Sequence, residues 1–227
     1  RDRDNYNYQK GMKAIIQELK NFLKRKDIGT DSDRALLLDF QATLEIKPEK
    51  AIKLEKDALA QIENITADNA RLVSNLHANL GGLYRMNGHP DLAREHMEKS
   101  ISLLDQFNLL HINDSIPQIA NYAMFLTEQQ EPERGISELQ KLSGIIKEYH
   151  SDDCLDYAKV QETLGTIYLM TANLPQAKTH FKRAFKIYEK IWADEPEMIE
   201  AKYQEIQELY PQIGFCIGKN LSGLLTK

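Results

Sequence analysis

The sequence has little of what disulfide-rich, metal-binding or sheet-forming proteins need. Its 227 residues include only two cysteines, Cys154 and Cys216, which lie far apart and indicate neither a disulfide framework nor a thiolate metal site. Glycine (11) and proline (7) are scarce, and no segment alternates Val, Ile or Thr with polar residues, which favours helices over sheets. We therefore expect an all-α protein with no metal and no cofactor, in a reducing cytoplasm.

Motifs of catalysis are also missing. The chain contains no Gly-x-x-x-x-Gly-Lys, His-Glu-x-x-His, Cys-x-x-Cys or Gly-x-Ser-x-Gly, and its six histidines are dispersed. His96 and His180 share a place in the repeat described below, where surface or packing roles are expected rather than metal binding. No enzyme activity is predicted.

The charge and hydropathy of the sequence argue against nucleic acid and membrane as partners. The net charge is −5, from 29 basic and 34 acidic residues that are interspersed, so the basic excess of a nucleic-acid-binding protein is absent. No apolar run approaches the roughly 20 residues that cross a bilayer, and no charged and then apolar leader opens the chain. We expect neither nucleic acid nor membrane as a partner. Because the chain opens on Arg1 rather than Met, we expect a processed or excised part of a longer protein.

What the sequence does contain is an internal repeat. Pro48, Pro90 and Pro132 follow one another at intervals of 42 residues. The same interval separates two further sets, Leu38, Leu80, Tyr122 and Leu164, and Ala51, Ala93, Gly135 and Ala177. Since proline is tolerated at the first position of a helix, the three prolines predict the starts of the second helix (B) of each pair. The small residues predict where B approaches the first helix (A) closely, with Ala93, Gly135 and Ala177 buried there.

The interval predicts three regions. Residues 1–31 would form an N-terminal linker and flanking helix, and residues 200–227 C-terminal helices that cap the apolar end of the stack. Residues 32–199 would hold four 42-residue repeats, at 32–73, 74–115, 116–157 and 158–199. The expected fold is a right-handed superhelical solenoid of antiparallel helix pairs.

The repeated residues resemble the tetratricopeptide signature of Leu-Gly, Tyr, Ala, aromatic and Ala. The fourth repeat carries it most fully, with Leu164, Gly165, Tyr168, Ala177, Phe181 and Ala184. The 42-residue period is similar to the longer-helix variety in kinesin light chains and many bacterial regulators. The first repeat departs from the signature, because Asp39 stands where Gly or Ala is expected, Ala42 replaces Tyr and Glu55 replaces the aromatic residue.

The resemblance implies a concave groove lined by the A helices. Its sixth position gives Asn79 and Asn121, whose amides could hold the backbone of an extended peptide. Alternatively, these asparagines cap or bridge neighbouring helices. The implied groove residues are Asn75, Asn79, Arg85, Met86, Asn121, Met124, Lys159, Thr163 and Met170. Flexible methionines suit varied apolar side chains, although Met86 and Met170 could instead pack against the adjacent repeat.

Three functions are compatible with this pattern. The principal hypothesis is a cytoplasmic protein-interaction module that binds a peptide or partner helix in the groove, as the sensor or scaffold part of a larger bacterial regulator. A second is a structural oligomerisation or scaffolding arm whose groove is filled by its own chain or by a second protomer; self-association could also occur through the terminal helices. A third is a regulatory segment of a nucleotide-switch ATPase or a peptide-pheromone receptor, both of which carry similar repeats in bacteria.

Overall fold

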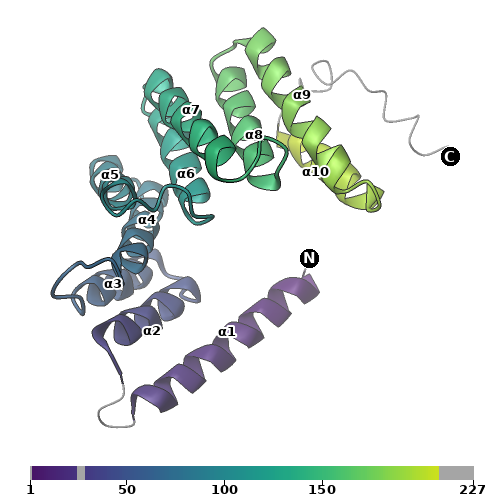
Figure 1. The fold of residues 1–227 in the computed structure, drawn as a ribbon. Coiled ribbons are helices and arrows are strands. Elements are labelled where there is room, and N and C mark those ends of the chain that lie inside the picture. The colour runs from purple at the N-terminus through teal and green to yellow at the C-terminus, as the bar shows by residue number, and fades with distance from the viewer. Residues whose placement is uncertain (1, 25–28, 210–227) are drawn as a thin grey trace. The chain divides into compact units, whose positions relative to one another are not determined.

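The fold is known from a computed structural model that describes residues 2–24 and 29–209 (Figure 1). Every regular element in these ranges is a helix, so the all-α prediction is confirmed. The helices are α1 (Asp2–Leu23), α2 (Asp31–Thr43), α3 (Pro48–Leu59), α4 (Ala70–Met86), α5 (Pro90–Gln106), α6 (Ser115–Glu128), α7 (Pro132–Tyr149), α8 (Leu155–Met170), α9 (Leu174–Ile191) and α10 (Pro196–Leu209).

The helices form two compact units, the first ending at Leu109 and the second beginning at Leu110. In the first unit α2 pairs with α3 and α4 with α5, and α1, whose Ile16 is buried, packs on α2. In the second unit α6 pairs with α7 and α8 with α9. Helix α10 follows α9, where Tyr203 stacks on Phe185 at 4.1 Å between ring centroids. The A helices are thus α2, α4, α6 and α8, and the B helices are α3, α5, α7 and α9.

The turns between the A and B helices repeat as well. Pro48, Pro90 and Pro132 are the first residues of α3, α5 and α7, as predicted. Ahead of the last three B helices, the turn places one residue in the left-handed region, at intervals of 42 residues. These residues are Gly88 (φ 75°), Gln130 (φ 64°) and Ala172 (φ 59°). The backbone therefore repeats more regularly than the residue types do, since only one of the three is the glycine that this conformation favours.

The small residues lie where the paired helices cross. Ala93 and Ala177 have no exposed surface, and Gly135 is buried, which confirms the predicted contacts. A Cβ atom at Gly165 would lie 2.9 Å from Cδ2 of Phe181, and one at Gly135 would lie 2.6 Å from the carbonyl oxygen of Ala123. Any side chain at these positions would push the helices of a pair apart.

Part of the sequence-based interpretation concerns residues 210–227, which lie outside the described residues. The capping helix expected there is therefore untested, and the division into 1–31, 32–199 and 200–227 stays a prediction. Within the ranges that the structure describes, no helix is long and apolar enough to span a membrane.

Candidate partner-binding surface

The predicted groove residues lie on three A helices. Helix α4, in the first unit, carries Asn75, Asn79, Arg85 and Met86. In the second unit, α6 carries Asn121 and Met124, and α8 carries Lys159, Thr163 and Met170. Helices α6 and α8 contact each other, so the second unit brings its five predicted residues onto two adjacent helices.

Asn79 is engaged within its own unit. Its Nδ2 donates to Oδ1 of Asp39 on α2 at 2.9 Å and to Oε1 of Glu55 on α3 at 3.2 Å. Both hydrogens of the amide are therefore used to join α4 to the preceding helix pair. Of the two interpretations of Asn79, the geometry favours the bridge between helices.

The acidic partners of Asn79 are the buried Glu55 and the half-buried Asp39. Only 2% of Glu55 is exposed, and its Oε2 accepts no hydrogen bond. Burial and the neighbouring Asp39 carboxylate raise the pKa of Glu55 to about 9, and burial also raises the pKa of Asp39. Glu55 therefore keeps its proton at neutral pH, and the protonated carboxyl can donate to Asp39 while it accepts from Asn79.

Asn121 differs from Asn79 although it holds the same place in the repeat. It is exposed, and its side chain makes no hydrogen bond within the described ranges. On the adjacent α8, Thr163 donates only to the carbonyl oxygen of Lys159 at 3.0 Å, one turn earlier. Lys159 forms an exposed ion pair with Asp156 at 3.6 Å, which contributes little to stability. The amide of Asn121 and the ammonium of Lys159 are therefore available to a ligand.

Apolar side chains are exposed at the ends of two A helices. Met86 closes α4 with 76% of its surface exposed, and Met170 closes α8 with 44% exposed. Met124, on α6, is half-buried. Asn75 and Arg85 are also half-buried, and neither is without a partner. The second unit thus offers polar and apolar contacts together, the combination that ligand sites use.

His96 and His180, which hold the same position in the repeat, both pack against a tyrosine. His96 stacks on Tyr84 at 5.4 Å and His180 stacks on Tyr168 at 5.2 Å, each from a B helix onto the A helix of its pair. Nδ1 of His96 also lies 2.9 Å from Nδ1 of His77, whose pKa falls to about 4, chiefly because it is buried. The packing role expected for His96 and His180 is confirmed. No group of three or more His, Cys, Asp or Glu that could hold a metal occurs in the described part of the chain.

Sequence reasoning missed one feature of the second unit, a cleft on its B helices. The signal was present, because Lys178, Lys182, Lys186 and Lys190 recur every four residues along α9. That spacing places them along one face of a helix.

The comparisons with known proteins agree with this architecture. Residues 115–190 match the sequence model of the tetratricopeptide repeat family. None of the curated proteins matches the chain. Among solved structures, BtubC (BKLC) from P. vanneervenii superposes with a TM-score of 0.64 at 19% identity, covering 79% of this chain and 72% of that one.

Two further structures are similar. The Q17M form of a kinesin light chain of Podosopora anserina with nearly identical TPR-like repeats has a TM-score of 0.66 at 13% identity, covering 84% of this chain and 92% of that one. MamA has a TM-score of 0.54 at 16% identity, covering 82% of this chain and 94% of that one. At these identities the likeness concerns the fold. The chain therefore has the fold of tetratricopeptide-like repeat structures, and its residues 115–190 match the model of that family.

Proposed function

We propose that the chain binds a peptide or partner helix on the A-helix surface of its second unit. The tetratricopeptide fold supports protein interaction and scaffolding in general. The observation that carries the proposal is the exposed Asn121, whose amide has no partner within the described part of the chain. A free amide on the helix surface can both donate to and accept from a peptide backbone.

The neighbouring side chains define the ligand. Lys159 would attract a carboxylate, and Met170 would contact an apolar side chain of the same peptide. In this proposal Asn79 has a structural role. Asn75, Arg85 and Met86 would form a separate surface of the first unit. The module would act in the cytoplasm as the sensor or scaffold of a larger bacterial regulator.

A second candidate function is self-association through the terminal helices. Helix α1 exposes 56% of Tyr8, 47% of Ile15 and 38% of Phe22, apolar surface that a second copy could cover. Sedimentation over a range of protein concentrations tests this candidate, because a monomer at all concentrations contradicts the oligomerisation arm. The third alternative, a regulatory segment of an ATPase or pheromone receptor, depends on sequence outside this chain.

The test of the principal proposal begins with peptides selected from a random library on the purified chain. Their affinity is then measured by fluorescence anisotropy. Replacing both Asn121 and Lys159 by Ala should weaken binding about tenfold, since each lost contact costs on the order of 1 kcal/mol. Lys182→Ala, an exposed lysine on the B helix α9, is the control and should leave the affinity unchanged. Equal affinities for the double variant and the wild type would refute the proposal.

A further inference from the structure

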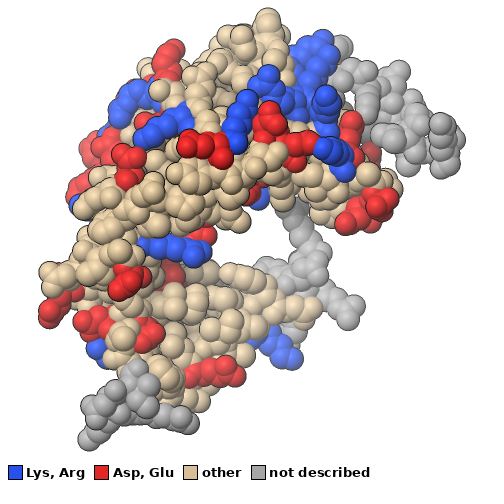
Figure 2. All heavy atoms as spheres, viewed as in Figure 1, with Lys and Arg blue, Asp and Glu red and all other residues tan. Residues whose placement is uncertain are grey.

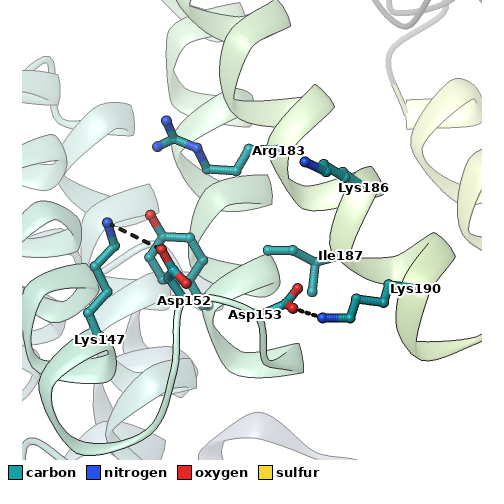
Figure 3. Close-up of a pocket in the computed structure, with 8 residues that line it drawn as sticks. Lys147, Asp152, Asp153, Arg183, Lys186, Ile187 and Lys190 are labelled. Carbon is teal, nitrogen blue, oxygen red and sulfur yellow. Dashed lines mark hydrogen bonds and ion pairs between the residues drawn. The ribbon is translucent and has the colours of Figure 1, made fainter.

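The second unit has a cleft on its B helices, away from the A-helix contacts described above. It has a volume of about 480 Å³ and lies between α7, α9 and the loop that joins α7 to α8 (Figure 3). Its charged lining consists of Lys147 from α7, Asp152 and Asp153 from the loop, and Arg183, Lys186 and Lys190 from α9. The buried Tyr157 and Ile187 give the cleft an apolar wall. The volume is in the range of clefts that bind small ligands or short peptide segments.

The cleft is basic although the chain as a whole is acidic. Helix α9 carries four lysines and Arg183 against one acidic residue, Glu189, while the net charge of the chain is −5. Its apolar residues, such as Phe181 and Phe185, are buried, which leaves the basic residues exposed. Figure 2 shows Lys and Arg gathered over α7 and α9, with acidic side chains between them. Such a local surplus of one sign attracts ligands of the other sign.

Two carboxylates of the chain already enter this cleft. Asp152 lies 3.9 Å from Nζ of Lys147, and Asp153 forms an ion pair with Lys190. These ion pairs show that the lysines of the cleft bind carboxylates. Arg183 and Lys186 form no ion pair with the other residues drawn in Figure 3. Arg183 makes one long hydrogen bond of 3.4 Å to Gln161, and Lys186 has no partner in the described part of the chain.

We propose that this cleft binds an acidic segment of a partner polypeptide, with Arg183 and Lys186 taking its carboxylates. The guanidinium of Arg183 can hold a carboxylate with two parallel hydrogen bonds, and Lys186 supplies a second charge one turn away. Tyr157 and Ile187 would contact an apolar side chain between the acidic ones. Asp152 and Asp153 compete for Lys147 and Lys190 and so limit the affinity.

A polypeptide fits this cleft better than a nucleic acid. A phosphate backbone carries charge at every step and would meet Asp152 and Asp153, whereas a peptide can place neutral residues opposite them. The site also differs from the surface of the proposed function, because α9 and the loop between α7 and α8 supply most of its lining, while α8 contributes only Tyr157 and α6 nothing.

The test uses the full chain and a fluorescein-labelled hexaglutamate peptide, followed by anisotropy at low salt. The double variant Arg183→Glu and Lys186→Glu should lose at least about tenfold in affinity, because like charges then oppose the ligand. The matched control, Lys178→Glu and Lys182→Glu, makes the same charge change on the same helix outside the cleft and should lose less than about twofold.

Two further measurements complete the test. Replacing Asp152 and Asp153 by Asn should raise the affinity about threefold or more, because two competing carboxylates are removed. This gain cannot arise from misfolding. An oligothymidylate of six nucleotides serves as a second probe. The proposal is overturned if the wild type does not bind hexaglutamate, if the control loses as much affinity as the cleft variant, or if the oligonucleotide binds more tightly than the peptide.

Discussion

The A and B helices of the first pair meet through two acidic side chains, whereas those of the fourth pair meet through a glycine and a phenylalanine. Asp39 and Glu55 hold the places in the repeat that Gly165 and Phe181 hold in the fourth pair. In the fourth pair an apolar ring fills the space left by the missing side chain. In the first pair Glu55 keeps a proton, and the amide of Asn79 donates to both carboxyl groups.

The same place in the repeat can therefore be filled in two ways, which differ in how the contact between the helices depends on pH. A glycine and a phenylalanine give contact that does not depend on pH. The acidic pair gives contact only while one carboxyl group stays protonated, since a second buried charge beside the first is costly. The predictions that follow test this difference.

The largest effect is expected from the fourth pair. Phe181 is fully buried against Gly165, so Phe181→Ala should remove about 3–5 kcal/mol from the free energy of unfolding by leaving a cavity. The only tryptophan, Trp192, stacks on Tyr188 at 4.9 Å in the same unit, so its fluorescence during urea unfolding reports the change. A loss below about 1 kcal/mol would show that this contact is not tightly packed.

The first pair should make stability depend on pH. The pKa of Glu55 is about 9 in the folded chain, compared with an ordinary value of 4.5. At any pH between these two values the folded state therefore binds more protons than the unfolded state. The contribution of Glu55 to the free energy of unfolding is complete below pH 4.5 and is lost as the pH rises toward 9. Between pH 6 and 8 the free energy of unfolding should fall by about 2–3 kcal/mol.

Urea unfolding followed by far-UV circular dichroism at several pH values measures this slope. Glu55→Gln keeps the shape and the hydrogen-bonding groups but cannot ionise, so it should flatten the dependence. If the Glu55→Gln variant kept the full pH dependence of the free energy of unfolding, that dependence would arise from other titratable groups. The matched variant at the equivalent place, Phe181→Leu, should lower the stability at every pH alike.

Overpacking the fourth pair should have a smaller effect than emptying it. Ala177 has no exposed surface at the crossing of α8 and α9, so Ala177→Leu should cost about 1–3 kcal/mol. The neighbouring Lys178 is exposed, so Lys178→Leu is the control and should change the unfolding midpoint little. If both variants have the wild-type midpoint, the assigned register of the repeat is wrong.

The smallest effects distinguish the two asparagines. Asn79→Ala removes two hydrogen bonds, one to the half-buried Asp39 and one to the buried Glu55, and should cost about 1–2 kcal/mol. Asn121→Ala removes no hydrogen bond within the described residues and should stay within about 0.5 kcal/mol of the wild type. Thermal unfolding of both variants measures the difference, and equal losses would contradict the separation of structural and ligand-binding roles.

Local patterns in the sequence predicted the fold well. Proline at the start of a B helix and a small residue at a helix crossing act through their own geometry, so Pro90, Pro132 and Ala177 were placed correctly. The repeat also predicted the packing of His96 and His180. These features depend on residue type and spacing, which the chain displays directly.

Contacts between distant side chains were harder to predict. The sequence showed that Asp39 and Glu55 depart from the repeat, but not that Asn79 would donate to both of them. The cleft on α7 and α9 was missed for the same reason. Its lysines are regular in the sequence, whereas the inward position of Asp152 and Asp153 depends on how the loop between two helices folds back.

Methionine methyl NMR can report whether a ligand binds the A-helix surface of the second unit. The chain has six methionines, which sample different surfaces. On titration with a selected peptide, the account predicts that the methyl signals of Met124 and Met170 shift while that of Met97, buried in the first unit, does not. Shifts confined to Met198 on α10, with Met124 and Met170 unchanged, would contradict it.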